Sequence, residues 1–417
     1  MKVFSSLPLL VQGIVLSMTV LAVHPDGLHA KSSHQAEYNA YPHPAVKLNA
    51  PGDPRDMRIA HLKSQGTFAG YWPAYEMRYR SGTKTSWKDI DKYQYIGSIQ
   101  AIQYDAKSNI VYTMRATAKD GAYIFASDYA TQKLLGHSCD PTVKRPYNGL
   151  YHFGHQNIAL FHPDDPKMIG PGEKPGSVYF FCGGYKLASY GGIEDKNLYR
   201  RLNLVTWDYR SPQTVGLRRS WLLFGSGYDN NNINPCLTPD GRFLIAKCHR
   251  LSDGVMVVGI WNVGKLLSIR DEHLDLSAVD RAGRPVFAER LFESPWKKKK
   301  ISVQCLVTDG KYLYTLSSGT SGRALHHIKV MTLDGKMVFD RPISSEGEER
   351  FGLPANRYEG EVLVFLPVNG QPHLHLAVYY KSTGKSDGMN RVLMYDLDQP
   401  SSQILQHGQR DGGDRRS

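Results

Sequence analysis

The chain has 417 residues, and its 51 Lys and Arg against 39 Asp and Glu give a formal net charge of +12 at pH 7. Its 25 Tyr and 39 Gly suit short strands and tight turns and argue against a helical bundle. A basic exported protein meets anionic polysaccharide, phospholipid or teichoic acid more readily than nucleic acid. The length fits one large all-β domain or two smaller domains.

Residues 1–30 have the pattern of a signal peptide. Lys2 supplies positive charge, an apolar segment covers residues 7–23, and Leu28-His29-Ala30 resembles a cleavage site. The alternative is an uncleaved membrane anchor, because the apolar segment is close to the length that spans a bilayer. Gln12 interrupts that segment, so we expect a secreted or periplasmic protein without stable membrane insertion after cleavage.

The rest of the chain divides by composition into three parts. Residues 31–70 are rich in His, Pro, Ala and Asn and predict an extended N-terminal arm. Residues 71–402 have a higher aromatic density and recurrent strand-like runs, and form the expected catalytic domain. Residues 403–417 are polar and charged, which predicts a disordered tail.

A tract repeats across the catalytic region. Ser98-Ile99-Gln100 and Ser302-Val303-Gln304 each open a short apolar run, an Asp-containing turn and a second apolar run. A looser copy covers residues 234–246, between the other two. This pattern is typical of a β-hairpin, and recurrent hairpins in a long chain indicate radial repetition.

Strand-like runs continue to the end of this region with no sustained helical period. Turn-forming pairs such as Asp240-Gly241, Asp309-Gly310 and Asp334-Gly335 divide them. The sequence therefore predicts an all-β fold, a single β-propeller of about seven four-stranded antiparallel blades, with a pair of β-sandwiches as the alternative. The predicted strands are 110–114, 122–126, 178–181, 202–207, 221–224, 243–246, 255–261, 312–316, 328–332, 362–366, 374–379 and 392–395.

Two further features leave alternatives open. Cys236 and Cys248 end the two strands of one predicted hairpin, so they could form a disulfide, join His249 in a structural zinc or calcium site, or remain buried reduced thiols. The run Lys297–Lys300 follows Trp296. We interpret it as a solvated loop, with a dedicated polyanion site as the alternative.

Polar and aromatic residues gather at successive strand ends. His155 and Asn157 lie immediately before the apolar run 158–161, and His137 precedes them by one strand pair. Strand ends in one propeller project toward one face, so we expect these groups to converge. The later strand ends present Gly183-Gly184-Tyr185, Tyr209-Arg210-Ser211 and His249-Arg250.

These residue types fit one reaction. No paired Asp/Glu motif stands out, whereas glycoside hydrolysis uses two carboxylates that flank the scissile bond. β-Elimination from a uronic acid needs a cation at the C5 carboxylate, a base for the C5 proton and an acid for the leaving oxygen. Arg supplies the bidentate cation, and His or Tyr can act as base and acid. Taken singly, Tyr185 could be a packing residue and Arg210 a rim salt bridge.

The tract from His137 to Arg250 resembles the active-site half of the seven-bladed propeller polysaccharide lyases that act on ulvan and rhamnosyl-glucuronate linkages. The resemblance rests on the two His residues, on Tyr185 after two glycines, and on Arg250 at a later strand end. It also rests on the similarity of Tyr209-Arg210-Ser211 to that family's Tyr-x-Arg-Ser motif.

The resemblance implies roles for individual residues. It makes Tyr185 the base and acid, His155 an assisting or sugar-binding group, and Arg210 or Arg250 the neutraliser of the carboxylate. The interval from Tyr185 to Arg210 leaves Tyr190 and Tyr199 as rival catalytic tyrosines and Arg201 as a rival arginine. The remaining residues that would bind substrate are His137, Asn157, Tyr190 and Tyr209.

We therefore expect a secreted, monomeric lyase whose partner is an anionic polysaccharide and not nucleic acid. It would need no cofactor for catalysis, although the resemblance implies a structural metal ion. The alternatives are a non-catalytic propeller that binds glycan or teichoic acid, and a sialidase-like glycoside hydrolase.

Overall fold

The computed structural model describes residues between Ser98 and Asp396, and all of them belong to one compact unit, residues 45–417. The predicted signal peptide, arm and tail therefore lie outside the described residues. The described ranges are 98–117, 121–130, 134–138, 157–171, 173, 177–184, 200–210, 215–297, 301–319, 327–342, 358–368, 371–380 and 391–396.

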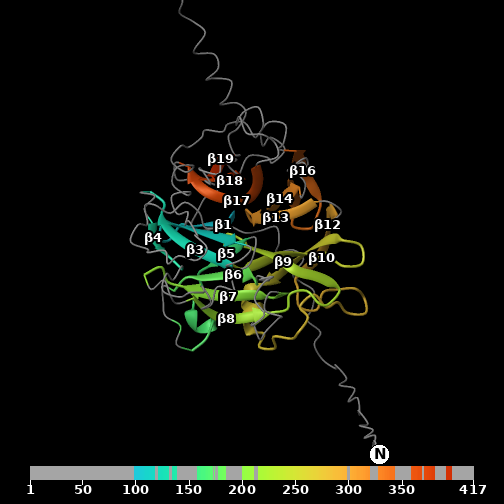
Figure 1. The fold of residues 1–417 in the computed structure, drawn as a ribbon. Coiled ribbons are helices and arrows are strands. Elements are labelled where there is room, and N and C mark those ends of the chain that lie inside the picture. The colour runs from blue at the N-terminus through green and yellow to red at the C-terminus, as the bar shows by residue number, and fades with distance from the viewer. Residues whose placement is uncertain are drawn as a thin grey trace, which may run out of the picture. The chain divides into compact units, whose positions relative to one another are not determined.

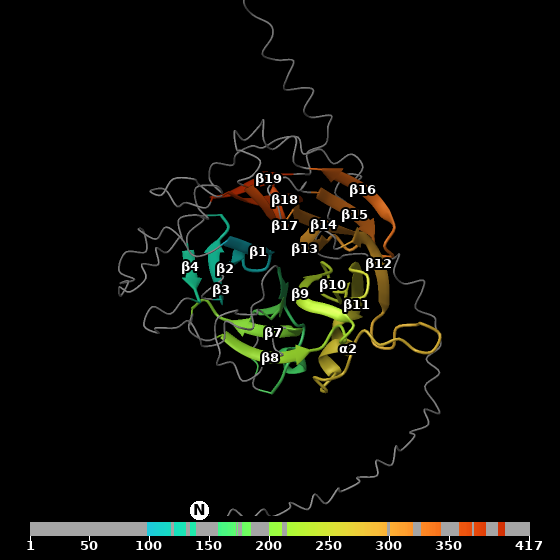
Figure 2. The same ribbon diagram turned by 45° about the vertical axis from the view of Figure 1, so that its right-hand side comes forward.

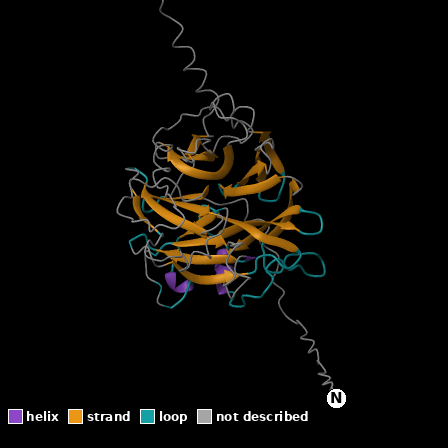
Figure 3. Ribbon diagram, in the orientation of Figure 1, coloured by secondary structure: helices purple, strands orange, loops and turns teal. Residues whose placement is uncertain are grey.

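The strands form five antiparallel sheets, which we number as blades 1 to 5 in chain order (Figures 1 and 3). Blade 1 contains β1 (Ser98–Asp105), β2 (Ile110–Thr117), β3 (Gly121–Asp128) and β4 (Leu134–His137). Blade 2 contains β5 (Ile158–Phe161), β6 (Tyr179–Gly183), β7 (Leu202–Trp207) and β8 (Val215–Trp221). Blade 3 contains β9 (Tyr228–Leu237), β10 (Phe243–Arg250), β11 (Val255–Asn262) and β12 (Arg290–Lys297).

Blade 4 contains β13 (Ile301–Thr308), β14 (Tyr312–Gly319), β15 (His327–Thr332) and β16 (Met337–Pro342). Blade 5 contains β17 (Tyr358–Val368), β18 (Gln371–Tyr380) and β19 (Arg391–Asp396). The short helices among the described residues are η6 (Pro166–Met168) and α2 (Val263–Ser268).

The first strand of each blade is its innermost strand, and these strands contact one another in cyclic order. β1 contacts β5, β5 contacts β9, β9 contacts β13, and β13 contacts β17, which returns to β1 (Figure 2). The prediction of an all-β propeller with four-stranded antiparallel blades is confirmed for four of the blades. The count of seven is not confirmed, because the described residues contain five sheets whose inner strands already close a ring.

Apolar side chains fill the spaces between neighbouring blades. One cluster joins blades 1 and 2 through Tyr112, Phe180 and Trp207, and another joins blades 2 and 3 through Trp221 and Trp261. All five side chains are almost completely buried. Burial of a large apolar side chain contributes roughly 1.5–3 kcal/mol to the free energy of unfolding, so these inter-blade layers stabilise the closed propeller.

Strand polarity separates two faces of the propeller. Since every strand pair is antiparallel, the first and third strands of a blade begin where the second and fourth end. We call the face on which the inner strands begin the start face. Asn157, just before β5, donates its backbone N–H to the carbonyl of Gln100 near the start of β1 (3.1 Å), so neighbouring inner strands begin side by side. In blades 1 to 4 the fourth strand therefore also ends on the start face.

The repeated tract corresponds to the inner hairpin of a blade. Its copies are β1–β2 in blade 1, β9–β10 in blade 3 and β13–β14 in blade 4, so the hairpin prediction is confirmed. The prediction of a strand over 221–224 is wrong, because β8 ends at Trp221 and the polypeptide turns toward β9. No helix within the described ranges has the length and apolar character of a membrane span.

The cysteine alternatives are also resolved for four of the five residues. Cys182, Cys236, Cys248 and Cys305 are buried and form no disulfide. Of the alternatives for Cys236 and Cys248, the structure therefore supports buried reduced thiols and not a disulfide; Cys236 pairs across the sheet with Ile245. Among the described residues, no group of three or more His, Cys, Asp or Glu side chains is arranged to hold a metal ion, so a site at Cys236, Cys248 and His249 is not supported.

Candidate functional site at the start face

A ring of polar side chains surrounds the centre of the propeller near the start face. Each blade contributes one residue from its inner strand or from the position just before it, and every one of these side chains is buried. Four of the five carry an amide and one carries a carboxylate. We call this set the central ring, and its members are Gln100, Asn157, Asn234, Gln304 and Glu361.

β-Bulges place several of these residues. The register between strands shifts at Gln100 in β1, at Gln304 in β13 and at Glu361 in β17, so each of these residues is skipped by the ladder. A bulge turns its extra residue away from the regular alternation of side chains. The Ser-x-Gln of the sequence repeat is thus the signature of a bulge at the propeller centre.

Asn157 links its own blade to three others. Its backbone N–H donates to Gln100 in blade 1, and its side-chain Nδ2 donates to the carbonyls of Pro235 in blade 3 (2.9 Å) and Leu306 in blade 4 (2.8 Å). Its φ is +76°, a conformation that Asn tolerates better than most residues. Only a residue on the propeller axis can reach blades on both sides in this way.

Asn234 makes a related contact. Its Nδ2 donates to the carbonyls of Gln304 (2.8 Å) and Val303 (3.3 Å) in β13. The Oδ1 atoms of Asn157 and Asn234 are both buried, and neither accepts a hydrogen bond from the residues that the structure describes. A buried acceptor without a donor costs about 1–3 kcal/mol, so these two oxygens mark a place where a further group would be stabilising.

The centre of the propeller contains two opposite charges, one in the ring (Glu361) and one beside it (Lys247). Lys247 is fully buried in β10 and pairs directly with Asn234 in β9, so both side chains leave the sheet on the same side. The pKa of the neighbouring Cys305 thiol is raised to about 12, mainly by burial. The carboxylate of Glu361 contributes to this rise, whereas the backbone N–H of Leu363 and the charge of Lys247 oppose it. The centre thus combines amides, one carboxylate and one ammonium group.

Three of the predicted site residues lie outside the described residues. They are His155, Tyr185 and Tyr190; the rival Tyr199 also lies outside. The chain positions that flank two of them are described. Asn157 follows His155 by two residues at the axis, and Gly184, which is buried, directly precedes Tyr185 at the end of β6. Both flanking positions belong to the start face.

Arg250 also lies at the start face, at the end of β10. Its guanidinium contacts two carboxylates, Asp253 Oδ2 at 2.5 Å and Glu293 Oε1 at 2.7 Å. Hydrogen bonds to Asp253 and Glu293 raise the pKa of Arg250 above its ordinary value. The side chain is about one-third exposed at 32%, so solvent reaches this cluster.

Arg210 and Tyr209 follow β7 and therefore lie on the opposite face. Arg210 is 70% exposed, contacts Asp208 Oδ1 at 2.9 Å, and its guanidinium lies 5.6 Å from the centroid of the Tyr209 ring. The backbone of Tyr209 packs against Gly136 of blade 1, where an added Cβ would meet the Tyr209 carbonyl at 2.4 Å. The structure thus does not bring Arg210 and Tyr209 together with Arg250.

His137 lies far from the propeller axis, and Arg201 is too buried to meet a substrate. His137 belongs to β4, the outermost strand of blade 1, where it pairs with Phe125. Arg201 is almost fully buried, and its guanidinium donates to the carbonyl of Glu272. Only part of the expected set of strand-end groups therefore shares one face. Among the described residues, Asn157, Gly184 and Arg250 lie at the start face.

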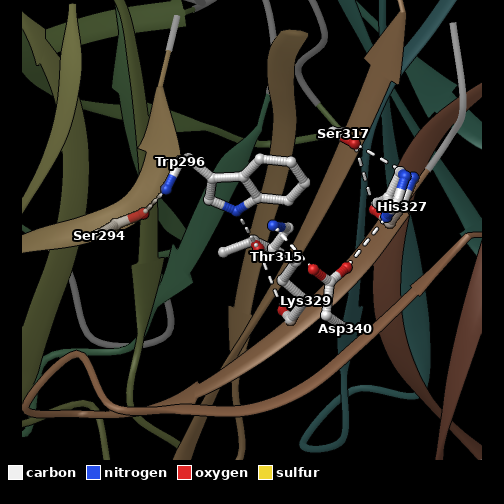
Figure 4. Close-up of polar contacts among 7 residues, drawn as sticks. All are labelled: Ser294, Trp296, Thr315, Ser317, His327, Lys329 and Asp340. Atoms are coloured by element: carbon white, nitrogen blue, oxygen red, sulfur yellow. Dashed lines mark hydrogen bonds and ion pairs between the residues drawn. The ribbon is translucent and has the colours of Figure 1, made fainter.

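A second polar cluster joins blades 3 and 4 farther from the axis (Figure 4). Trp296 of β12 donates its indole N–H to Thr315 Oγ1 (2.8 Å), and the Lys329 ammonium lies 4.3 Å from the centroid of its ring. Asp340 lies between Lys329 (2.9 Å) and His327 (3.0 Å). We call this the inter-blade latch: Ser294, Trp296, Thr315, Ser317, His327, Lys329 and Asp340.

Sequence reasoning named Asn157 but missed the central ring as a set of residues, and it missed the latch. The signal for the ring was present, because Ser98-x-Gln100 and Ser302-x-Gln304 recur with the same spacing to an Asp turn. The latch had no such signal, because its members come from four strands with no shared motif.

No family model matches the chain, and no curated protein matches its sequence. Among solved structures, the tail fiber of Staphylococcus aureus phage P68 has a TM-score of 0.42 and 13% identity over 77% of this chain, which spans 54% of the tail fiber chain. A GH43 endo-arabinanase from Bacillus licheniformis has a TM-score of 0.38 and 13% identity, over 74% of this chain and 95% of that one. The assignment of the fold rests on the five sheets themselves.

Proposed function

We propose that this protein is an exported β-propeller that acts on an anionic, uronic-acid-containing polysaccharide through its start face, and that it cleaves this polysaccharide by β-elimination. One observation supports the proposal above the others. The described flanks of His155 and Tyr185, together with Arg250, belong to strand ends of the same face in the neighbouring blades 2 and 3.

Charge at the same face supports an anionic substrate. Lys297 ends β12 and Ile301 begins β13, and both ends belong to the start face. In the sequence, the run Lys297–Lys300 joins these two strand ends; Lys298 to Lys300 lie outside the described residues. Clustered cations raise the local concentration of a polyanion and its rate of association.

The proposed chemistry assigns one step to each group. Tyr185, assisted by His155, removes the C5 proton of the uronic acid. The electron pair forms the C4–C5 double bond, and the C4–O bond breaks. The proton then passes to the leaving oxygen. Arg250 binds the C5 carboxylate, for which the substrate must displace Asp253 or Glu293 from the guanidinium.

The central ring offers little support for a two-carboxylate hydrolase. Retaining and inverting glycosidases both place a pair of carboxyl groups beside the glycosidic bond. Of the five ring positions only Glu361 carries a carboxylate, and it is 4% exposed. Lyase chemistry needs no such pair.

The test is incubation of the full-length protein with a panel of polyuronides, including ulvan, while the ultraviolet absorbance of the 4,5-unsaturated uronide is followed. We expect an absorbance increase that Tyr185→Phe abolishes. An increase that survives Tyr185→Phe keeps the lyase and overturns the assignment of the base. No increase on any polyuronide contradicts the lyase.

A second candidate is a propeller that binds polysaccharide without cleaving it. The double ion pair of Arg250 favours this alternative, because a guanidinium held by Asp253 and Glu293 is already neutralised. Affinity electrophoresis in polyuronide-containing gels distinguishes the two: retardation without any unsaturated product indicates binding alone.

A further inference from the structure

Arg250, to which the proposed function assigns the substrate carboxylate, contacts two carboxylates that are held in different ways. Asp253 belongs to the turn that directly follows Arg250, whereas Glu293 comes from β12, the outermost strand of blade 3. The side chains of Asp253 and Glu293 are 43% and 59% exposed, so both contacts meet solvent. The difference between the two carboxylates determines which of them a substrate displaces.

Asp253 is fixed by the turn in which it lies. Its Oδ1 accepts the backbone N–H of Val255 (3.0 Å), and the Gly254 N–H donates to the carbonyl of Arg250 (2.8 Å) within the same turn. Arg250 Nε donates to both oxygens of Asp253 (3.1 and 3.2 Å), and Nη2 donates to Oδ2 (2.5 Å). The hydrogen bonds from Arg250, followed by that from Val255, hold the pKa of Asp253 below its ordinary value. Asp253 is therefore an anion that orients the guanidinium.

Glu293 contacts the same guanidinium without a local turn to hold it. Its Oε1 lies 2.7 Å from Nη1 of Arg250, and the contact joins the second and fourth strands of the blade. An exposed ion pair between two long side chains contributes little free energy, because the ordering of both side chains opposes the Coulomb attraction. An incoming anion therefore displaces Glu293 more readily than the turn-bound Asp253.

Displacement of Glu293 leaves a complete binding edge on Arg250. A guanidinium carries five N–H donors in one plane, and Asp253 occupies those on the side of Nε and Nη2. The N–H groups on the far edge, on Nη1 and Nη2, form the parallel pair that matches the two oxygens of a carboxylate. A sugar hydroxyl offers one oxygen and no charge, so it competes poorly with Glu293.

We propose that Glu293 is an internal competitor for the substrate carboxylate, and thereby a specificity-determining residue of the start face, while Asp253 is a positioning residue for Arg250. This inference rests on the proposed function, because it concerns how the same site selects its substrate. A uronic acid takes the place of Glu293 on Nη1, whereas a neutral sugar leaves the internal ion pair intact. The two carboxylates therefore have opposite effects on binding, although both carry the same charge.

The experiment measures the binding of ulvan, polygalacturonate and alginate to the full-length protein by affinity electrophoresis. We expect Glu293→Gln to bind a polyuronide about two- to fivefold more tightly than the wild type, the factor that an exposed ion pair supplies. Asp253→Asn keeps an oxygen for the Val255 N–H but offers only one to Arg250. We expect it to bind about two- to tenfold more weakly, because the guanidinium must then be ordered on binding. A general loss of negative charge would instead strengthen binding in both variants.

Glu289→Gln is the matched control. Glu289 directly precedes β12 at the opposite face and contacts Lys265 (2.6 Å), so the variant changes the net charge equally without touching Arg250. Where product forms, Glu293→Gln should lower KM and leave kcat unchanged, because the removed competition affects the ground state and the transition state alike.

The outcomes separate this inference from the proposed function. A wild-type protein that binds none of the three polyuronides overturns the proposed function, and this inference with it. If the wild type binds but Glu293→Gln binds no more tightly than Glu289→Gln, only the role of Glu293 as a competitor is overturned. If Asp253→Asn strengthens binding, Asp253 is a second competitor and not a positioning residue.

Discussion

The central ring and the inter-blade latch both join blades through polar groups, but they use different chemistry. In the ring, the amides of Asn157 and Asn234 are completely buried and donate to backbone carbonyls of other blades. In the latch, Asp340 is 41% exposed and contacts Lys329 and His327 beside a buried Trp296 ring (Figure 4).

The difference predicts where the stability of each region resides. A buried amide has no water as an alternative partner. Breaking its hydrogen bond therefore lowers the free energy of unfolding by the full cost of leaving its partner unsatisfied. Exposed ion pairs contribute little, because solvent and salt screen them. The latch should therefore depend on its indole and the ring on its amides, while the latch ion pairs should contribute least.

Trp296→Ala should cause the largest loss. The indole is 3% exposed and its N–H reaches Thr315 Oγ1. Removal of a buried Trp side chain typically lowers the free energy of unfolding by roughly 3–5 kcal/mol. Chemical denaturation measures the change, with Trp296→Phe as the control that retains most of the apolar contact. A loss below about 1 kcal/mol, the scale of an exposed contact, would show that the indole does not hold the blades together.

Asn157→Ala should follow, with a loss of about 2–4 kcal/mol, because it leaves the buried carbonyls of Pro235 and Leu306 without a donor and places Ala at a φ of +76°. Asn157→Gly removes the same side chain but tolerates the backbone conformation. The difference between the two variants therefore separates strain from hydrogen bonding. Wild-type stability in both would contradict the account of the ring.

Asp105→Asn tests a polar contact at the face opposite the ring. His162 Nε2 lies 3.0 Å from Asp105 Oδ1, and the carboxylate is 2% exposed. Burial alone would raise the pKa of Asp105, but hydrogen bonds from His162 and Ser108 lower it below its ordinary value. The contact thus stabilises the fold above the ordinary pKa of about 4 and is lost as pH falls through the lower pKa of the folded state.

We expect Asp105→Asn to cost about 1–3 kcal/mol at neutral pH, and its stability to fall less than that of the wild type on acidification below about pH 4. Thermal unfolding measured across this range provides the comparison. Parallel pH profiles for the two proteins would show that Asp105 is not the group responsible.

Asp340→Asn should have the smallest effect. Burial would raise the pKa of Asp340, but Lys329 and His327 together hold it below its ordinary value. Because the side chain is 41% exposed, the substitution should cost less than about 1 kcal/mol at neutral pH. The cost should shrink further at high salt. A loss as large as that of Trp296→Ala would reverse the ranking on which the comparison rests.

The sequence predicted the inner parts of the blades better than the outer parts. The run 202–207 matches β7, and the repeated tract matches the inner hairpins. These strands are packed on both faces, so their apolar residues are nearly continuous. The outer strands β4, β12 and β16 were not predicted, because their outer sides meet solvent and their composition is mixed, as in Arg290–Lys297.

The candidate site was only partly predictable for a related reason. Periodicity indicated that Arg210 and Arg250 end strands, but not that β7 is a third strand and β10 a second strand of their blades. That difference places the two arginines on opposite faces. When an outer strand is missed, each later strand end is assigned to the wrong face. Local sequence patterns do not show on which face a strand ends.

The most direct test of the account compares these two arginines. Arg250 ends β10, Arg210 follows the end of β7, and both contact a neighbouring aspartate. Arg250→Ala and Arg210→Ala therefore compare the two faces, although Arg250 also contacts Glu293. The measurement is polyuronide binding and formation of the unsaturated product by the two variants and the wild type. If the start face is functional, Arg250→Ala lowers both and Arg210→Ala leaves both unchanged. Loss with Arg210→Ala and wild-type behaviour of Arg250→Ala would contradict the account.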